Sequence, residues 1–177
     1  AITDNTGALL AVHPSNFRIT GFTHTPNITE LAELGKKCQI PVLHDVGSGC
    51  LLETAEFGLS HEPTPQESIH AGVSAVFFSG DKLLGGPQSG IIAGRKTVID
   101  QMAKHPLSRA IRIDKLSLTA LDATLRHYIE NEATKQIPVW NMIAKSKHVL
   151  ASKAKKWSEL LGPGNKVTTG ISTIGGG

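Results

Sequence analysis

The chain has 177 residues, 40% of them hydrophobic and 19% charged, with a net charge of +3 and a pI near 8.9. These values allow one sizeable core and are compatible with an anionic partner without being diagnostic of one. Two isolated cysteines fit a reducing compartment, and neither a membrane-length apolar run nor a secretory signal is visible, so we expect a cytoplasmic protein that does not enter a membrane.

The N-terminal part predicts two short strands separated by a turn. Strands are expected over Ala8–Val12 and Arg18–Phe22, separated by the turn-like cluster His13-Pro14-Ser15-Asn16. His13, Asn16 and Arg18 lie in or next to the turn. They are either site residues or ordinary polar turn residues.

The next segments alternate between helix and strand. A helix is expected over Thr29–Cys38, with Thr29 as N-cap, acidic residues early and lysines late. A strand over Val42–Val46 follows, then a short helix within Cys50–Phe57 and another helix over Pro65–Ala71. This order is typical of a parallel, doubly wound α/β sheet.

A single lysine follows the apolar strand Ala75–Phe78. Lys82 lies just past the carboxyl end of that strand, in a loop that continues into a Gly-Gly-Pro turn. This edge is where open α/β sheets bind ligands. A partly desolvated lysine there can attack a carbonyl and form a Schiff base. The alternative is an ordinary surface lysine after a strand.

A carboxylate marks the end of the neighbouring strand and favours the first interpretation. Asp45 precedes a Gly-Ser-Gly turn, and alone it could equally be a helix cap or a turn residue. Together, Asp45 and Lys82 are what pyridoxal 5'-phosphate (PLP) requires. The lysine carries the cofactor aldehyde, and the aspartate keeps the pyridine nitrogen protonated. His44, His61 and His70 lack ligand spacing, so no metal site is predicted.

The chain then leads out of the sheet through a basic connection. Gly90–Gly94 predicts a strand and Arg95–Lys104 a helix, followed by the connection His105–Lys115. Arg109 and Arg112 would share a face if this segment is helical. They either bind a phosphate-like anion in bidentate fashion or pair with surface carboxylates.

Two amphipathic helices complete the chain, over Leu116–Ala133 and Val139–Leu161. The two tryptophans of the second helix are expected in the core or between subunits. Its lysine-rich face is either solvated or in contact with a nucleic acid. A turn and a strand over Val167–Ile171 would open a small domain. We therefore expect residues 1–105 to belong to a large domain and 106–177 to comprise connecting helices and the start of the small one.

Several motifs closely resemble one protein family. They are H-D-V-G-S-G at 44–49, F-F-S-G-D-K-L-L-G-G-P-Q-S-G at 77–90 and H-P-L-S-R-A-I-R-I-D-K at 105–115, together with residues 6–22 and 172–177. The resemblance is to the bacterial selenocysteine synthases, the L-seryl-tRNA(Sec) selenium transferases. It implies the fold of fold-type-I PLP enzymes, which resemble aspartate aminotransferase. Family members are longer at both ends, so the chain looks like an internal fragment.

The resemblance also implies roles for individual residues. Lys82 would hold PLP as an internal aldimine, and Asp45 would pair with the pyridinium. Ser79 would bind the cofactor phosphate. Gly85 and Gly86 would let the backbone approach closely, including towards the phosphate of a neighbouring subunit. Arg109 and Arg112 would bind selenophosphate.

The activity implied is conversion of L-seryl-tRNA(Sec) to L-selenocysteinyl-tRNA(Sec) through an aminoacrylyl intermediate, in a homo-oligomer built from dimers and extending to larger rings. One alternative is another fold-type-I PLP enzyme, a lyase or aldolase acting on a small amino acid. The other is a non-catalytic fragment that serves assembly or RNA binding.

Overall fold

The computed structural model describes residues 1–14 and 21–170. The strands are β1 (Leu9–Val12), β2 (Val42–Gly47), β3 (Ala75–Ser79) and β4 (Gly90–Gly94). The helices are α1 (Ile28–Cys38), the 3-10 turn η1 (Thr54–Phe57), α2 (Pro65–Ala71), α3 (Lys96–Lys104), α4 (Pro106–Ala110), α5 (Lys115–Ile129), α6 (Ala133–Gln136), α7 (Pro138–Ile143) and α8 (Lys147–Leu161).

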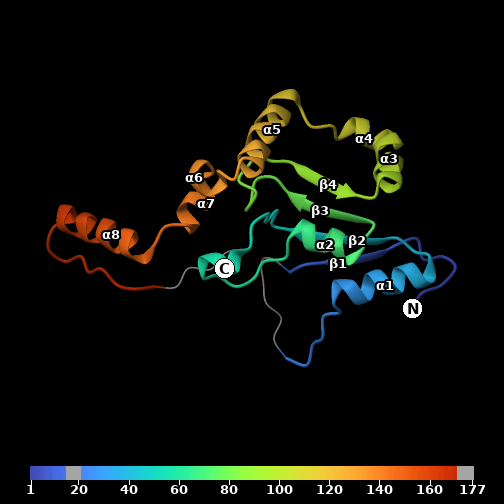
Figure 1. Cartoon of the computed structure of the whole chain (residues 1–177), viewed down its shortest axis with the longest axis horizontal. Helices are drawn as coiled ribbons and strands as arrows, with labels where there is room; N and C mark the ends of the chain where they lie inside the picture. The colour runs from blue at the N-terminus through green and yellow to red at the C-terminus, as the bar shows by residue number, and fades with distance from the viewer. Residues whose placement is uncertain (15–20, 171–177) are drawn as a thin grey trace.

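The four strands form one mixed sheet in the order β1-β2-β3-β4 (Figure 1). The first three strands are parallel, and β4 is antiparallel to β3. The expected mostly parallel α/β sheet is therefore confirmed. Parallel neighbours end at the same edge, so the segments that follow β1, β2 and β3 all start there.

Alternation along the strands sends successive side chains to opposite faces of the sheet. One face packs against α1, with Ile28 and Leu31 contacting a buried cluster of Val42, Val46, Val73, Val76 and Phe78. The opposite face is more open, since Leu10, Val12 and Ile92 are 64%, 62% and 45% exposed. The sheet thus has one covered face and one accessible face within this chain.

Local capping explains where the two helices on the covered face begin. Asn27 caps α1, and its side chain accepts a hydrogen bond from the Thr29 backbone N–H at 2.9 Å. The predicted cap at Thr29 was therefore two residues late. Thr64 forms a capping box with Glu67 at the start of α2, where Pro65 occupies the first helical position.

Other expected elements also differ in the structure. Only Thr54–Phe57 of the helix expected within Cys50–Phe57 forms, as a 3-10 turn. The helix expected over Val139–Leu161 is two helices, because the chain leaves helical geometry after α7 and Ser146 caps a new start at α8. Strands were also expected over Arg18–Phe22 and Val167–Ile171. Residues 21–22 and 167–170 are irregular, and the rest of both segments falls outside the described residues.

The C-terminal helices differ strongly in how they are packed. A second core cluster joins Cys50 and Leu83 to Ala133, Ile137 and Trp140, so α6 and α7 pack directly beneath the loop that follows β3. In contrast, α8 contains no buried residue and extends away from the sheet (Figure 1). Across residues 1–14 and 21–170, no helix is long and apolar enough to cross a bilayer.

Candidate functional site

The loops that follow β2 and β3 contact each other at the carboxyl edge of the sheet. The Leu83 backbone N–H donates to the Ser48 carbonyl at 2.9 Å. Gly49 is packed so closely that a β-carbon there would overlap the Ser79 carbonyl oxygen, and its φ is +66°. The residue after Lys82 is therefore hydrogen-bonded to the turn that follows Asp45.

Asp45 lies in the second half of β2, in one row with Val12 on β1 and Phe77 on β3. This row belongs to the accessible face, because its neighbours in sequence, His44 and Val46, are buried on the face that α1 and α2 cover. The ladder shifts register immediately after Asp45, at an irregularity between Asp45 and Gly47. The Asp45 carboxyl is half-buried on the face that is open to a ligand.

His44 has a structural role on the covered face. Its Nδ1 lies 2.9 Å from the Ser68 hydroxyl of α2, and the residue is 8% exposed. Burial lowers the pKa of His44, and the nearby His13 contributes in the same direction. His44 therefore links β2 to α2 as a neutral imidazole, whereas Asp45 faces the other side.

The loop from Gly80 to Gly86 is closed by its own backbone. The Gly86 N–H donates to the Gly80 carbonyl at 2.8 Å, and the Gly85 N–H donates to the Lys82 carbonyl at 3.0 Å. Gly85 has a φ of +74°, and a β-carbon there would overlap Cγ2 of Ile137. Glycine is required at position 85 by this turn and by packing within the chain.

The predicted cofactor residues surround this pair of loops. Ser79 is the last residue of β3 and is half-buried, whereas Lys82 and its neighbour Asp81 are exposed. Ser48 is only 4% exposed, and its hydroxyl has no hydrogen-bond partner among the described residues. A primary amine, a carboxylate and two hydroxyls at one edge of the sheet form a donor set that fits PLP.

The two arginines lie farther along the chain. Arg109 is in the last turn of α4, whereas Arg112 follows the end of that helix, so the two do not share one helical face. α4 lies beside α3, which starts at the end of β4 away from the Lys82 loop (Figure 1). Both arginines are exposed, and neither forms an ion pair with the residues the structure describes.

Of the three polar residues noted near the first strand, the structure describes one. The His13 N–H donates to the Asp45 carbonyl at 2.8 Å and extends the ladder between β1 and β2. Its Nε2 lies 3.7 Å from a carboxylate oxygen of Glu62. Asn16 and Arg18 lie outside the described residues. His13 therefore borders the Asp45 segment through its backbone.

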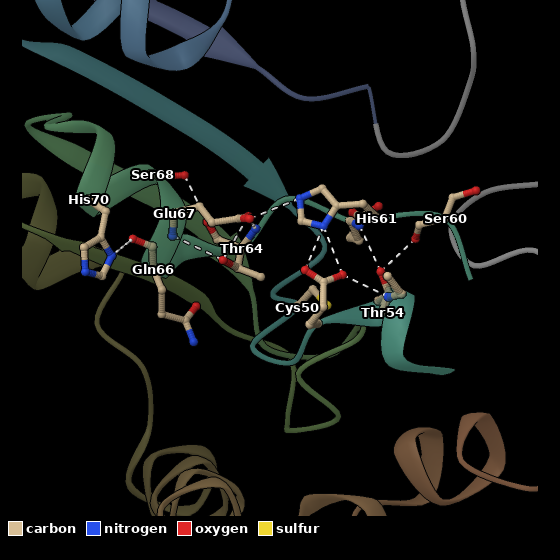
Figure 2. A network of polar contacts seen from close by, with 12 residues as sticks. Cys50, Thr54, Ser60, His61, Thr64, Gln66, Glu67, Ser68 and His70 are labelled. Carbon is tan, nitrogen blue, oxygen red and sulfur yellow. Dashed lines mark hydrogen bonds and ion pairs between the residues drawn. The ribbon is translucent and has the colours of Figure 1, made fainter. Parts of the chain in front are cut away.

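Sequence reasoning missed a polar network between η1 and α2, because the path of the loop that brings its members together cannot be read from periodicity or capping. Nδ1 of His61 lies 3.1 Å from Glu53, and Nε2 lies 3.2 Å from Glu67. Figure 2 shows the His61 ring in contact with two carboxylates, and the Glu67 side chain reaching back to Thr64. The Glu53 hydrogen bond and the charge of both carboxylates raise the pKa of His61.

This arrangement predicts that stability depends on pH through His61. A raised folded-state pKa stabilises the fold fully below the unfolded value of 6.5 and progressively less as pH rises through the folded value. Because the His61 side chain is 47% exposed, the contribution is about 0.5 kcal/mol. Urea unfolding, measured as pH rises from below 6.5 through the folded-state pKa of His61, should show a falling free energy of unfolding in the native chain. This fall should be absent in His61→Gln. An unchanged decline in Glu53→Gln with Glu67→Gln would contradict it.

The chain is similar to known proteins of one family. The family model for L-seryl-tRNA selenium transferase matches residues 1–177. The curated L-seryl-tRNA(Sec) selenium transferase of Alkaliphilus metalliredigens (strain QYMF) is 52% identical over 155 residues, which are 87% of this chain and 33% of that protein. The enzyme of the same name from Clostridium botulinum (strain Loch Maree / Type A3) is 47% identical over 182 residues, covering 99% of this chain and 39% of that protein.

A solved structure supports the fold independently. D-Glucosaminate-6-phosphate ammonia-lyase aligns with 73% of this chain and 31% of its own, with a TM-score of 0.56 and 24% identity. The expected α/β fold class is thereby confirmed. This chain spans between a third and two fifths of the length of the curated relatives described above. It belongs to the L-seryl-tRNA selenium transferase family.

Proposed function

We propose that the protein converts L-seryl-tRNA(Sec) to L-selenocysteinyl-tRNA(Sec), with PLP as cofactor and selenophosphate as selenium donor. The observation that carries this proposal is the match of the family model over residues 1–177. The hydrogen-bonded contact between the Asp45 and Lys82 segments supports it from the structure, because both groups must act on one cofactor ring.

Four residues of this chain would hold the cofactor. The Lys82 amine forms the covalent link, and the Asp45 carboxylate holds the proton on the pyridine nitrogen. The hydroxyl of Ser79 at the end of β3 binds the phosphate. Ser48, whose buried hydroxyl lacks a partner among the described residues, is available for a further hydrogen bond at the same edge.

The bound cofactor supplies an electron-withdrawing ring that stabilises negative charge at the substrate Cα. Once its amine is free, Lys82 takes the Cα proton as a general base. The β-hydroxyl then departs as water with a proton supplied by Lys82, and the selenium of selenophosphate forms its bond at the same β-carbon while a proton returns to Cα. A water molecule hydrolyses the Se–P bond, so the phosphorus leaves as inorganic phosphate. Lys82 is exposed on a short loop, which leaves its amine able to reach both the cofactor and the substrate.

The selenium donor is an anion, for which we propose Arg109 and Arg112 as ligands. Their guanidiniums are exposed and form no ion pair within the described residues, so the alternative role of pairing with surface carboxylates gains no support. Arginine suits phosphate-like groups because its planar donors bind two oxygens together.

The test uses the full-length protein with PLP, seryl-tRNA(Sec) and labelled selenophosphate. We expect label in aminoacyl-tRNA from the native protein, and about a hundredfold less from Arg109→Ala, whose cofactor absorbance should be unchanged because Arg109 does not hold PLP. Lys104→Ala, which removes a neighbouring exposed cation, is the matched control. Release of ammonia or an aldehyde from small amino acids, without any labelled tRNA, would replace the proposal with a lyase or aldolase.

The resemblance further supports a cytoplasmic homo-oligomer built from dimers. Light scattering of the full-length protein should then give a mass that is an even multiple of the subunit mass. A monomeric mass with full activity would contradict this part of the proposal.

A further inference from the structure

The loop that carries Lys82 is held on its downstream side by the only tyrosine of the chain. The Tyr128 hydroxyl, on α5, donates to the Leu84 carbonyl at 2.8 Å, and the Leu83 carbonyl lies at 3.3 Å as a second acceptor. These two carbonyls belong to the two residues that directly follow Lys82. A side chain 44 residues away in sequence therefore binds the backbone next to the reactive lysine.

A second side chain orients this tyrosine. The indole Nε1–H of Trp140, on α7, donates to the Tyr128 hydroxyl at 2.6 Å. Trp140 is fully buried, and its ring packs against Phe57 with a centroid separation of 5.6 Å. Since the indole N–H can only donate, it leaves the tyrosine proton directed at the loop carbonyls. Burial also raises the pKa of Tyr128, so the hydroxyl remains a neutral donor.

Burial and other contacts also restrict the backbone of residues 83–85. Leu84 is fully buried and Leu83 is 8% exposed, whereas the preceding residue, Lys82, is exposed. Ile137 fills the space beside Gly85, and the Leu83 N–H is bonded to Ser48. The tyrosine hydrogen bond thus adds to the contacts that hold the backbone next to the exposed Lys82 side chain.

We propose that Tyr128 and Trp140 are positioning residues that fix the backbone after Lys82 and so set where its amine meets the cofactor. This inference rests on the proposed role of Lys82 as the cofactor lysine. The pair acts through the Leu83 and Leu84 carbonyls. It also couples α5 and α7, which come from the C-terminal half, to the catalytic edge of the sheet.

The decisive variant is Tyr128→Phe, which keeps the ring and removes only the hydroxyl. In the cofactor-free full-length protein, we expect the backbone amides of Leu83, Gly85 and Gly86 to exchange hydrogen about tenfold faster, while amides within β2 and β3 stay at native rates. On loading, the dissociation constant for PLP, measured by absorbance titration, should rise about tenfold. Trp140→Phe should show the same changes in weaker form.

The matched control is Phe57→Leu, which loosens packing against Trp140 without removing a hydrogen bond to the loop. It should leave loop exchange and the PLP dissociation constant within about twofold of native. Native loop exchange in Tyr128→Phe, or equal loop-specific acceleration in Phe57→Leu, would overturn the positioning role. If native protein fails to link PLP to Lys82, the proposed function is lost, and the exchange rates alone still decide whether the tyrosine holds the loop.

Discussion

Replacing Lys82 with alanine is expected to abolish both the visible absorbance of bound PLP and all turnover of seryl-tRNA(Sec). The amine is the proposed covalent anchor and the proposed base, so one substitution removes two roles that no neighbouring group can fill. Among residues 80–86 the chain offers no second lysine. The measurement is an absorbance spectrum with PLP, followed by borohydride reduction and peptide mapping of the modified lysine.

The control for this experiment is Lys96→Ala. Lys96 is exposed and forms an i,i+4 ion pair with Asp100 at 2.6 Å, an interaction that contributes little to stability. This variant should retain native absorbance and turnover. Modification of a lysine other than Lys82, or residual turnover at the native rate in Lys82→Ala, would refute the assignment.

Asp45→Asn is expected to lower kcat by roughly 100- to 1,000-fold while PLP still attaches to Lys82. Asparagine keeps the size of the side chain but lacks the negative charge that holds a proton on the pyridine nitrogen. The fold should tolerate the change, because the Asp45 carboxylate is half-buried on the accessible face and belongs to no ion pair of the described residues. Steady-state kinetics with seryl-tRNA(Sec) and the absorbance spectrum separate the two effects.

Two controls make this result specific. Asp81→Asn removes the exposed carboxylate next to Lys82 in sequence and should change kcat less than Asp45→Asn does. Urea unfolding of Asp45→Asn should match the native protein. Native kcat in Asp45→Asn, or a larger loss in Asp81→Asn, would show that the wrong carboxylate had been assigned to the ring.

Local signals in the sequence were sufficient for most elements around the site. Pro65–Ala71 and Gly90–Gly94 match the structure residue for residue, because a capping box, a proline at the first helical position and short apolar runs act over a few neighbours. The same local pattern placed Asp45 at the end of one strand and Lys82 just after another. The break in the long C-terminal helix was not predicted, since Ser146 as a cap resembles any exposed helical serine until the packing of α7 is known.

The sequence by itself determined the family and the α/β class, and it singled out Lys82 and Asp45 as the candidate cofactor residues. Only the tertiary structure decided that Asp45 lies on the accessible face, that Leu83 is bonded to Ser48, and that Tyr128 holds the lysine loop. It also separated the two tryptophans of one predicted helix, burying Trp140 completely and leaving Trp157 55% exposed. The physical reason is that such contacts join residues tens of positions apart, where periodicity and capping carry no information and only the packing of the whole chain selects the partner.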